Sequence, residues 1–200
     1  EAMGATAIIL AAGKGTRMQS DLPKVLHPAA GRPMLAWVAD ACRAAGCAPV
    51  LAVVGHQASR VEQSMADCDG RLTWVRQEPQ LGTGHAVMCC REHLESVSGE
   101  VIVLAGDGPL VTAETLAKLL STHRSEGADC TLATCILPEP GRHGRIVRDA
   151  DGRLAGIVEY LDADEQQRAI REVNVSMYCF AAEALRASLQ AITADNAKGE

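Results

Sequence analysis

The residues of this chain best suited to chemistry begin at a short glycine loop. A strongly apolar run at residues 7–10 leads directly into A-A-G-K-G-T-R at residues 11–17. Gly13 and Gly15 can adopt positive φ and lack Cβ, so their backbone N–H groups can turn toward an anion and approach it closely. The pattern predicts a phosphate-binding loop at the end of a buried strand.

Three cations accompany this loop. Lys14 and Arg17 lie within it, and Lys24 follows in P-K-V-L, where Pro23 stiffens the backbone. The loop is not a Walker motif, which needs G-x-x-x-x-G-K-S/T, nor a dinucleotide fingerprint, because Met18 stands where a third Gly or Ala is required. Glycines also occur in ordinary strand-to-helix turns, but the nearby cations favour phosphate binding.

Two carboxamides and a second glycine turn follow a later predicted strand. Gln77 and Gln80 come after the strand at residues 72–76, and G-T-G at residues 82–84 opens a helical pattern. Because a carboxamide presents a donor and an acceptor side by side, such a pair can read the edge of a nucleobase. A polar first turn of a helix explains either glutamine alone, but poorly explains both beside a glycine turn.

A single carboxylate stands at the end of another apolar run. Residues 101–105 are followed by G-D-G-P-L, which places Asp107 at the carboxyl end of a predicted strand. An aspartate beside phosphates is a natural Mg²⁺ ligand. An aspartate that caps a turn or a helix is equally common, so Asp107 alone does not indicate a metal site. Only the neighbouring phosphate-binding motifs favour that interpretation.

A third group of polar residues falls in the second half of the chain. Gly144 precedes a predicted hairpin, Glu159 ends it, and Asn174 lies at the start of the next apolar run. A glycine, a carboxylate and a carboxamide suit a ligand rich in hydroxyl groups. Each alone is typical of an ordinary surface, but with the earlier motifs they predict a sugar pocket that faces a nucleotide pocket.

Apolar runs and helical periodicities alternate through the first part of the chain. The predicted strands are residues 7–10, 49–54, 72–76, 101–105 and 130–137. The predicted helices are residues 34–45, 85–94 and 112–125, with a further short helix opened by a capping box at Ser59-x-x-Glu62. This alternation predicts an α/β fold with a doubly wound, Rossmann-like and mostly parallel sheet, whose ligands bind at the carboxyl ends of the strands.

The alternation of predicted strands and helices ends at P-E-P-G, residues 138–141. Residues 146–148 and 154–160, joined by a turn at 149–152, predict a hairpin. A short helix at 162–170, a strand at 173–180 and a helix at 182–192 are expected to follow. We therefore assign residues 3–200 to one domain, with a nucleotide-binding half at 3–137 and a sugar-binding half at 138–200.

Composition excludes several classes of function. The net charge is −6, which disfavours a nucleic-acid or anionic-membrane surface, and aromatic residues make up only 2% of the chain, so stacking platforms for bases are not expected. The apolar runs are too short to span a membrane, and the N-terminal stretch has neither the basic start nor the cleavage site expected of a signal peptide. The eight cysteines form no C-x-x-C pair and are expected to be reduced, buried thiols of a soluble cytoplasmic protein.

The ordered motifs resemble those of the bacterial N-acetylglucosamine-1-phosphate uridylyltransferases, in their N-terminal domain. They read L-A-A-G-K-G-T-R-M, L-P-K-V-L-H, Q-L-G-T-G-H-A-V, G-D-x-P-L, G-R-I-V-R, G-I-V-E and E-V-N, within a match from residue 7 to residue 200. The resemblance implies the nucleotide-diphospho-sugar transferase fold, with a hairpin-containing sugar-binding insert. It also implies that UTP and N-acetylglucosamine 1-phosphate react to give UDP-N-acetylglucosamine and pyrophosphate, with Mg²⁺ as cofactor.

The resemblance also implies a role for each motif residue. Arg17, Lys24 and Asp107 would be the catalytic residues, with Asp107 as the metal ligand. The nucleotide would contact Leu10, Ala12, Gly13, Gly15, Gln77, Gln80, Gly82 and Thr83. The amino sugar would contact Gly144, Glu159 and Asn174.

Such a site needs no protein nucleophile. A sugar phosphate is largely dianionic at neutral pH, so it can attack the α-phosphorus of UTP directly, and the protein contributes positioning and charge neutralisation.

Two alternative functions stay open. The chain could be a related transferase that uses CTP or GTP on another phosphorylated alcohol, or a nucleotide-sugar-binding module with weakened catalysis.

The resembled family continues past the position of Glu200. Its members carry a second metal-ligating Asn there, and commonly a β-helix acetyltransferase domain follows. We therefore expect this chain to be a truncated and poorly active form, and we expect a homo-oligomer only where that further domain is present. In addition, bulk at Val175-Ser176 replaces the family's small residue and Gly after the Asn.

Overall fold

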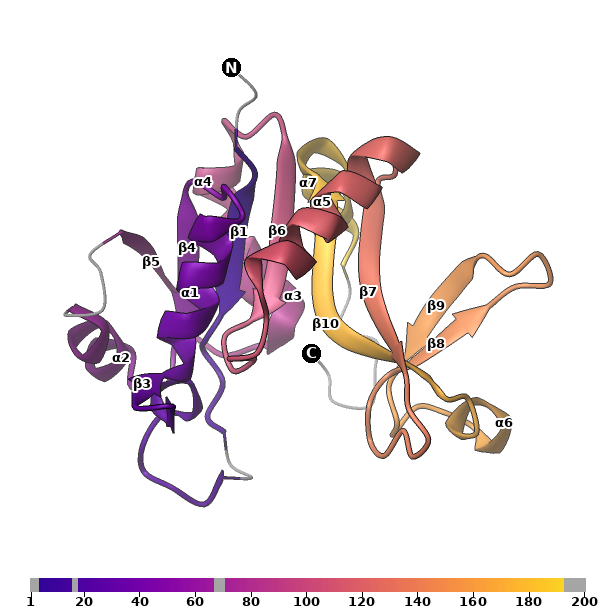
Figure 1. Cartoon of the computed structure of the whole chain (residues 1–200), viewed down its shortest axis with the longest axis horizontal. Helices are drawn as coiled ribbons and strands as arrows, with labels where there is room; N and C mark the ends of the chain where they lie inside the picture. Colours follow the sequence, from indigo (N-terminus) through magenta and orange to yellow (C-terminus); the bar gives the residue numbers. More distant parts are fainter. Residues whose placement is uncertain (1–3, 16–17, 67–70, 193–200) are drawn as a thin grey trace.

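The chain is built on one eight-stranded sheet with a parallel half and an antiparallel half (Figure 1). The computed structural model describes residues 4–15, 18–66 and 71–192. The strands are β1 (Thr6–Leu10), β4 (Val50–Val54), β5 (Leu72–Arg76), β6 (Glu100–Ala105), β7 (Cys130–Ile136), β8 (Arg145–Arg148), β9 (Leu154–Val158) and β10 (Glu172–Ala181), with β2 (Pro28–Ala29) and β3 (Arg32–Pro33) in a separate ribbon. The helices are α1 (Met34–Ala44), α2 (Ala58–Met65), α3 (Gly82–Met88), α4 (Arg91–Leu94), α5 (Ala113–Glu126), α6 (Glu165–Arg168) and α7 (Ala182–Ala191), with a 3-10 turn η2 (Lys24–Leu26).

Four strands form the parallel half, in the order β5-β4-β1-β6. Ile8 of β1 is in register with Leu51 of β4 on one side and with Val103 of β6 on the other. Helices between successive strands return the chain to the starting edge, so the strands run in one direction. The predicted α/β class, with a mostly parallel central sheet, is confirmed.

Strand β10 joins the two halves of the sheet. It pairs antiparallel with β6, where Tyr178 is opposite Val103, and antiparallel with β7, where Tyr178 is opposite Leu132. Strand β7 therefore runs in the same direction as β6, but β10 lies between them. Residues 130–137, predicted as a further strand of the parallel series, thus belong to the antiparallel part. The β8–β9 hairpin continues the sheet from β10 and extends away from the parallel half with α6 (Figure 1).

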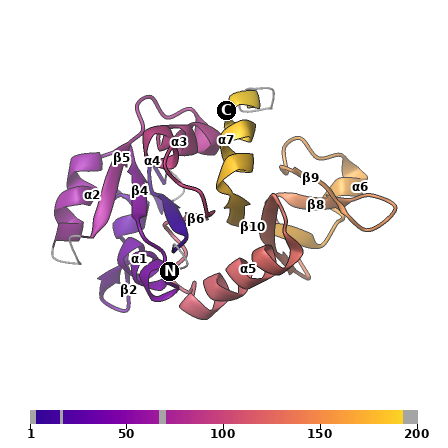
Figure 2. The ribbon, with the colours of Figure 1, turned by 90° about the horizontal axis from the view of Figure 1, so that it is seen from above.

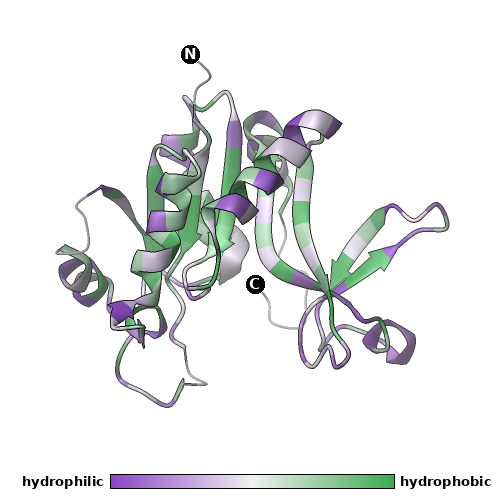
Figure 3. Cartoon of the chain, viewed as in Figure 1, coloured by the Kyte–Doolittle hydropathy of each residue, from purple (hydrophilic) through white to green (hydrophobic). Residues whose placement is uncertain are grey.

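Helices cover both faces of the parallel strands (Figure 2). Helices α1, α2 and α5 pack on one face, and α3, α4 and α7 pack on the other. Side chains of the central strands alternate between the two layers: Ile9 and Leu104 face the first, and Ile8 and Val103 face the second. Figure 3 shows hydrophobic residues along these strands. Because both faces are covered, these runs of sequence are continuously apolar.

Helix α5 has the ends that its sequence predicts. The Thr112 hydroxyl accepts a hydrogen bond from the Thr115 N–H at 3.2 Å, and Gly127 ends the helix in the left-handed conformation, with a φ of 56°. None of the helices within the described residues is long and apolar enough to span a bilayer.

The capping box predicted at Ser59 is wrong. Helix α2 begins at Ala58, two residues earlier than a Ser59 N-cap would place it, and the Ala58 N–H donates to the Gly55 carbonyl at 3.1 Å. Gln57 is the N-cap residue in the left-handed conformation, and its side chain makes no capping bond. The turn that follows β4 therefore starts the helix, and Ser59 lies inside the first helical turn.

The helix predicted at residues 85–94 is divided into α3 and α4. The Cys90 N–H donates to the Val87 carbonyl at 2.9 Å, which tightens the last turn of α3. Cys90 and Leu94, four residues apart, are both buried in the core that α3, α4 and α7 share. The apolar spacing therefore continues through residues 85–94 and does not reveal the break between the two helices.

The cysteines are only partly in the predicted environment. Cys42, Cys47, Cys90 and Cys179 are buried, but Cys130 and Cys135 are exposed. Cys68 lies outside the described residues. Both exposed thiols belong to β7, which pairs only with β10 among the described strands and lies at an edge of the sheet. Ile136 of the same strand is 71% exposed, so an apolar run here does not indicate burial.

Candidate functional site

The carboxyl ends of the parallel strands meet at one edge of the sheet, where most of the predicted site residues lie. Backbone hydrogen bonds continue past the strand ends and hold the loops together. The Gly106 N–H donates to the Leu10 carbonyl at 2.9 Å, and the Gln77 N–H donates to the Val54 carbonyl at 2.8 Å. Residues that follow β1, β4, β5 and β6 are thereby fixed beside one another, as the topology requires.

The glycine loop after β1 packs against the start of η2. Gly15 has a φ of +62°, and a Cβ added there would lie 2.7 Å from the Cβ of Lys24. Only glycine satisfies both conditions without strain. A Cβ on Gly13 would meet nothing within 4 Å, so this part of the loop is open to a ligand. Arg17, predicted as a catalytic cation, lies outside the described residues.

Lys24 forms an ion pair with Asp107, so the structure brings together two of the predicted catalytic residues. Both side chains are about one-third exposed, at 35% and 28%. Gly106 permits this approach, because a Cβ there would come within 3.1 Å of both the Leu10 carbonyl oxygen and Ile9 Cγ2. The end of β6 therefore lies directly against β1 and its loop.

The donor set around Asp107 suits Mg²⁺ bound together with phosphates. Across the described residues, no cluster of three or more His, Cys, Asp or Glu side chains could hold a metal ion. Mg²⁺ commonly takes one or two carboxylates and completes its shell with phosphate oxygens and water. Asp107 offers one carboxylate at a strand end beside the open loop at Gly13, which matches the small number of protein ligands that such an ion needs.

Gln77 is held rigidly at the end of β5. Its side chain is 3% exposed, and its Nε2 donates to the Gly82 carbonyl at 2.8 Å and lies 3.2 Å from His85 Nδ1. Gly82 has a φ of +94°, a conformation that favours glycine at the start of α3. Thr83, beside it, is exposed. No role was predicted for His85 from the sequence. Its spacing was an available signal, because a residue three positions after Gly82 lies one helical turn along α3, on the same face.

Gln80 acts as a brace between two loops. Its Nε2 donates to the Ala12 carbonyl at 2.5 Å, which ties the second glycine turn to the first. Gly55, at the end of β4, makes this possible, because a Cβ there would lie 2.7 Å from Gln80 Nε2 and 3.1 Å from the Gln77 carbonyl oxygen. Gly55 was not predicted as a site residue. The sequence did contain a signal for it, because Gly55 directly follows the apolar strand predicted at residues 49–54.

The three predicted sugar-binding residues also come together. A Cβ on Gly144 would lie 2.9 Å from Glu159 Oε1, and the Asn174 N–H donates to the Gly144 carbonyl at 2.9 Å. Glu159 is exposed and Gly144 is buried. Strand β10 begins its pairing with β6 at Met177, opposite Leu104. Asn174 therefore lies beyond the carboxyl end of β6, which is the edge that carries Asp107.

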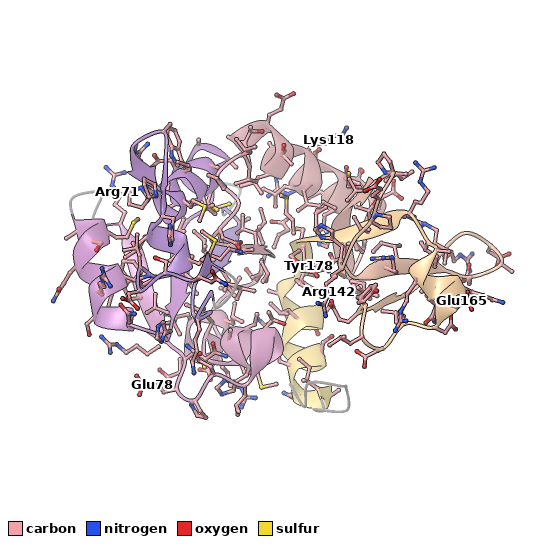
Figure 4. All side chains as sticks on the ribbon, turned by 90° about the horizontal axis from the view of Figure 1, so that it is seen from below. Arg71, Glu78, Lys118, Arg142, Glu165 and Tyr178 are labelled. Carbon is pink, nitrogen blue, oxygen red and sulfur yellow. The ribbon has the colours of Figure 1, made fainter. Side chains whose placement is uncertain are left out.

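The Asn174 side chain is oriented by a bulge in β10. Its Nδ2 donates to Tyr178 Oη at 2.6 Å, and its Oδ1 accepts from the Ser176 N–H at 3.0 Å. The register of β10 shifts between these residues, and Ser176 has a φ of +56°. Figure 4 shows Tyr178 near the middle of the molecule. Tyr178 was missed because its partnership with Asn174 depends on the bulge.

Arg145 braces the loop that carries Gly144. Its buried guanidinium donates to the carbonyls of Gly141 at 2.8 Å and Arg168 at 3.2 Å, and also to that of His143. It also lies 5.8 Å from the ring centroid of Tyr160. These bonds satisfy a buried charge with carbonyl dipoles and fix the backbone beside the three residues predicted to bind the sugar.

Sequence relatives cover nearly the whole chain. Residues 7–177 match the model of the MobA-like NTP transferase domain. Two proteins called bifunctional protein GlmU, from Trichlorobacter lovleyi and Geobacillus thermodenitrificans, are each 48% identical to it. These alignments cover 97% of this chain but 42% of each relative. The chain thus spans less than half the length of these curated relatives.

Two solved structures share the fold. The crystal structure of HddC from Yersinia pseudotuberculosis, complexed with GMP-PN, has a TM-score of 0.70 at 20% identity, and the match covers 90% of this chain and 77% of that one. Apo-UDP-glucose pyrophosphorylase has a TM-score of 0.76 at 16% identity, with 98% and 83% covered. At these identities the similarity establishes the fold, and the predicted fold type is confirmed.

Proposed function

Because the chain belongs to the MobA-like NTP transferase domain family, we propose that its site transfers a nucleotidyl group from a nucleoside triphosphate to a sugar phosphate. The substrates that we propose are UTP and N-acetylglucosamine 1-phosphate, and the products are UDP-N-acetylglucosamine and pyrophosphate. The similarity to the two GlmU proteins and the ordered motifs of the chain support this choice.

One observation carries the proposal. The ion pair of Lys24 and Asp107 lies beside the open glycine loop, at the strand ends where Gln77 is also held. A cation, a carboxylate and a loop of backbone donors are what a triphosphate needs, and a carboxamide nearby can read its base. We propose that residues 3–137 bind the nucleotide and residues 138–200 supply the sugar contacts.

The reaction that we propose is a direct in-line displacement. An oxygen of the sugar phosphate forms a bond to the α-phosphorus of UTP as the bond from that phosphorus to the β-phosphate oxygen breaks, and pyrophosphate leaves. Lys24 and Arg17 neutralise charge on the phosphates, and the glycine loop positions them. Asp107 would hold Mg²⁺, which supplies positive charge along the phosphate chain.

The two ends of the substrate pair have separate sets of contacts. Gln77 and the backbone of Gly82 would contact uracil, and the open backbone at Gly13 would contact the phosphates. Gly144, Glu159 and Asn174 would contact the hydroxyl and acetamido groups of the sugar. We also propose a cytoplasmic location, a reducing compartment in which the seven free cysteines of the described residues would stay reduced.

Product analysis tests this function. The chain is incubated with each of UTP, CTP and GTP, in all combinations with N-acetylglucosamine 1-phosphate and other hexose 1-phosphates, and products are identified by mass spectrometry. We expect UDP-N-acetylglucosamine to dominate. A dominant CDP or GDP product would favour the related-transferase alternative, and tight UTP binding without any product would favour the binding module.

A Gln77→Ala variant should lose discrimination between bases while keeping its phosphate contacts. We expect the ratio of kcat/KM for UTP over CTP to fall about tenfold or more, because a site that hydrogen-bonds a base rejects analogues that leave its polar groups unpaired. Gln63→Ala, on the exposed side of α2, is the control. An unchanged UTP/CTP ratio in Gln77→Ala would contradict base reading by this side chain.

A Gly144→Ala variant should weaken sugar binding alone. The new Cβ would lie 2.9 Å from Glu159 Oε1 and 3.2 Å from Ile157 Cγ2, and both residues are exposed, so their side chains can shift and the fold should be retained. We expect the KM for the sugar phosphate to rise about tenfold with the KM for UTP unchanged. Gly156→Ala, where a Cβ meets nothing within 4 Å, should leave both values unchanged. Equal increases in both KM values would contradict the assignment.

A further inference from the structure

We infer that His85 is a positioning residue that decides which end of the Gln77 carboxamide faces the nucleobase, and that it thereby selects uracil over cytosine. The inference deepens the proposed function and rests on it, because it concerns how the same site distinguishes UTP from CTP. Its structural basis is the pair of contacts from Gln77 Nε2 to the Gly82 carbonyl and to His85 Nδ1.

The first contact fixes the orientation of the carboxamide. The carbonyl oxygen of Gly82 can only accept a hydrogen bond, so the atom 2.8 Å from it must be the donor nitrogen of Gln77 and not its oxygen. That nitrogen carries two hydrogens. One is used by Gly82, and the other is directed at His85 Nδ1, 3.2 Å away.

The second contact fixes the tautomer of His85. Because Gln77 donates, Nδ1 must accept, and the ring proton therefore lies on Nε2. The nearest partner for Nε2 is Cys89 Sγ at 4.0 Å, one turn further along the chain, which can accept weakly from that proton. The neutral ring thus presents an acceptor to Gln77 and a donor to Cys89.

Both donors of the Gln77 carboxamide are consequently used inside the protein. Among the described residues no donor contacts its Oε1, and this oxygen is not among the buried polar atoms that lack a partner. It therefore remains accessible as an acceptor on a side chain that is otherwise 3% exposed. The structure leaves one polar atom of Gln77 for a ligand, and that atom accepts.

An acceptor at this position distinguishes the two pyrimidines. Uracil carries a hydrogen on N3 and can donate it to Gln77 Oε1. In cytosine N3 is an acceptor, so its lone pair would repel the lone pairs of Gln77 Oε1. Without an acceptor at residue 85, the carboxamide loses one of the two partners that hold its nitrogen inward. It can then rotate and present its NH₂ group, which suits cytosine.

Three variants of the 200-residue chain test this inference by binding. His85→Leu keeps much of the volume but removes the acceptor, His85→Asn places an acceptor oxygen close to the position of Nδ1, and His93→Leu alters an exposed histidine on α4 as the matched control. The dissociation constants of UTP and CTP are measured by isothermal titration calorimetry, so the readout does not depend on turnover.

We expect His85→Leu to lower the ratio Kd(CTP)/Kd(UTP) about tenfold. His85→Asn should restore most of that ratio, and His93→Leu should leave it unchanged. If His85 had only a structural role, His85→Leu would weaken the binding of UTP and of CTP to a similar extent, and Kd(CTP)/Kd(UTP) would stay near the value of the unmodified chain. Thermal unfolding of each variant shows whether the fold is retained, and the ratio is compared only among folded variants.

A double-mutant cycle with Gln77→Ala shows whether His85 acts through Gln77. The double variant, Gln77→Ala with His85→Leu, should have the same nucleotide ratio as Gln77→Ala alone, because the carboxamide that His85 orients is gone. Additive losses would overturn the inference.

The outcomes separate the inference from the function on which it rests. If the unmodified chain binds UTP no better than CTP, the proposed base preference fails, and the inference fails with it. If the unmodified chain prefers UTP and His85→Leu retains that preference, the inference alone is overturned. A restored ratio in His85→Asn, together with a non-additive cycle, supports both.

Discussion

An Asp107→Asn variant is expected to lose turnover by about 10³-fold or more, while its melting temperature stays within a few degrees of the unmodified chain. Asp107 follows the carboxyl end of β6, and replacing its carboxylate removes the negative charge that would hold Mg²⁺ against the phosphates. The fold should tolerate the change, because the side chain is partly exposed and its ion pair contributes at most about 1 kcal/mol.

Pyrophosphate release at saturating UTP, Mg²⁺ and N-acetylglucosamine 1-phosphate measures this effect. Asp40→Asn is a suitable control. Asp40 also forms ion pairs, one with Arg32 of β3 and one with Arg43 of α1, but it lies outside the candidate site. We expect the control to retain full turnover. Near-normal rates for Asp107→Asn, with unchanged Mg²⁺ dependence, would refute the metal assignment.

A Lys24→Ala variant is expected to lower kcat by about 10²-fold with a much smaller change in the KM for UTP. The ammonium group would neutralise charge that develops on the phosphates as the bond to pyrophosphate breaks, so its removal affects the transition state more than the bound substrate. Lys24 lies against Gly15 and beside Asp107, which places its charge at the centre of the proposed phosphate site.

Lys118→Ala, an exposed lysine on α5 (Figure 4), controls for a general loss of positive charge. Lys24→Arg should recover only part of the activity, because a planar guanidinium does not reproduce a compact ammonium. If Lys24→Ala raised the KM for UTP tenfold and left kcat intact, Lys24 would contribute to uniform binding and not to the transition state.

Local sequence was sufficient to place the site residues at strand ends. Each of the four parallel strands is a short, mostly apolar run, and a glycine or glutamine (Gly13, Gly55, Gln77 or Gly106) follows within three residues of its end. In a parallel sheet all such ends share one edge, so the chain order alone predicts that the residues after β1, β5 and β6 meet. The loop at Gly13 and Gly15, Gln77 and Asp107 were all predicted for this reason.

Sequence patterns failed where burial depends on neighbours. The apolar run of β7 predicted buried thiols, yet Cys135 is exposed because β10 occupies the position between β6 and β7. The apolar spacing of residues 85–94 continues through Cys90 and Leu94, yet a tight turn at Cys90 divides the predicted helix. Periodicity records the spacing of apolar residues, but not which element will cover them.

The amino-acid sequence by itself therefore determined the α/β class, the parallel half and the residue types available at its edge. Only the tertiary structure decided which of those residues act on one another: Lys24 with Asp107, Gln80 with the Ala12 carbonyl, and Asn174 with Tyr178. It also turned Gln77 toward Gly82 and His85, leaving only its acceptor for a base. These pairings depend on strand order, close glycine contacts and a bulge, which are long-range consequences of packing that no local spacing encodes.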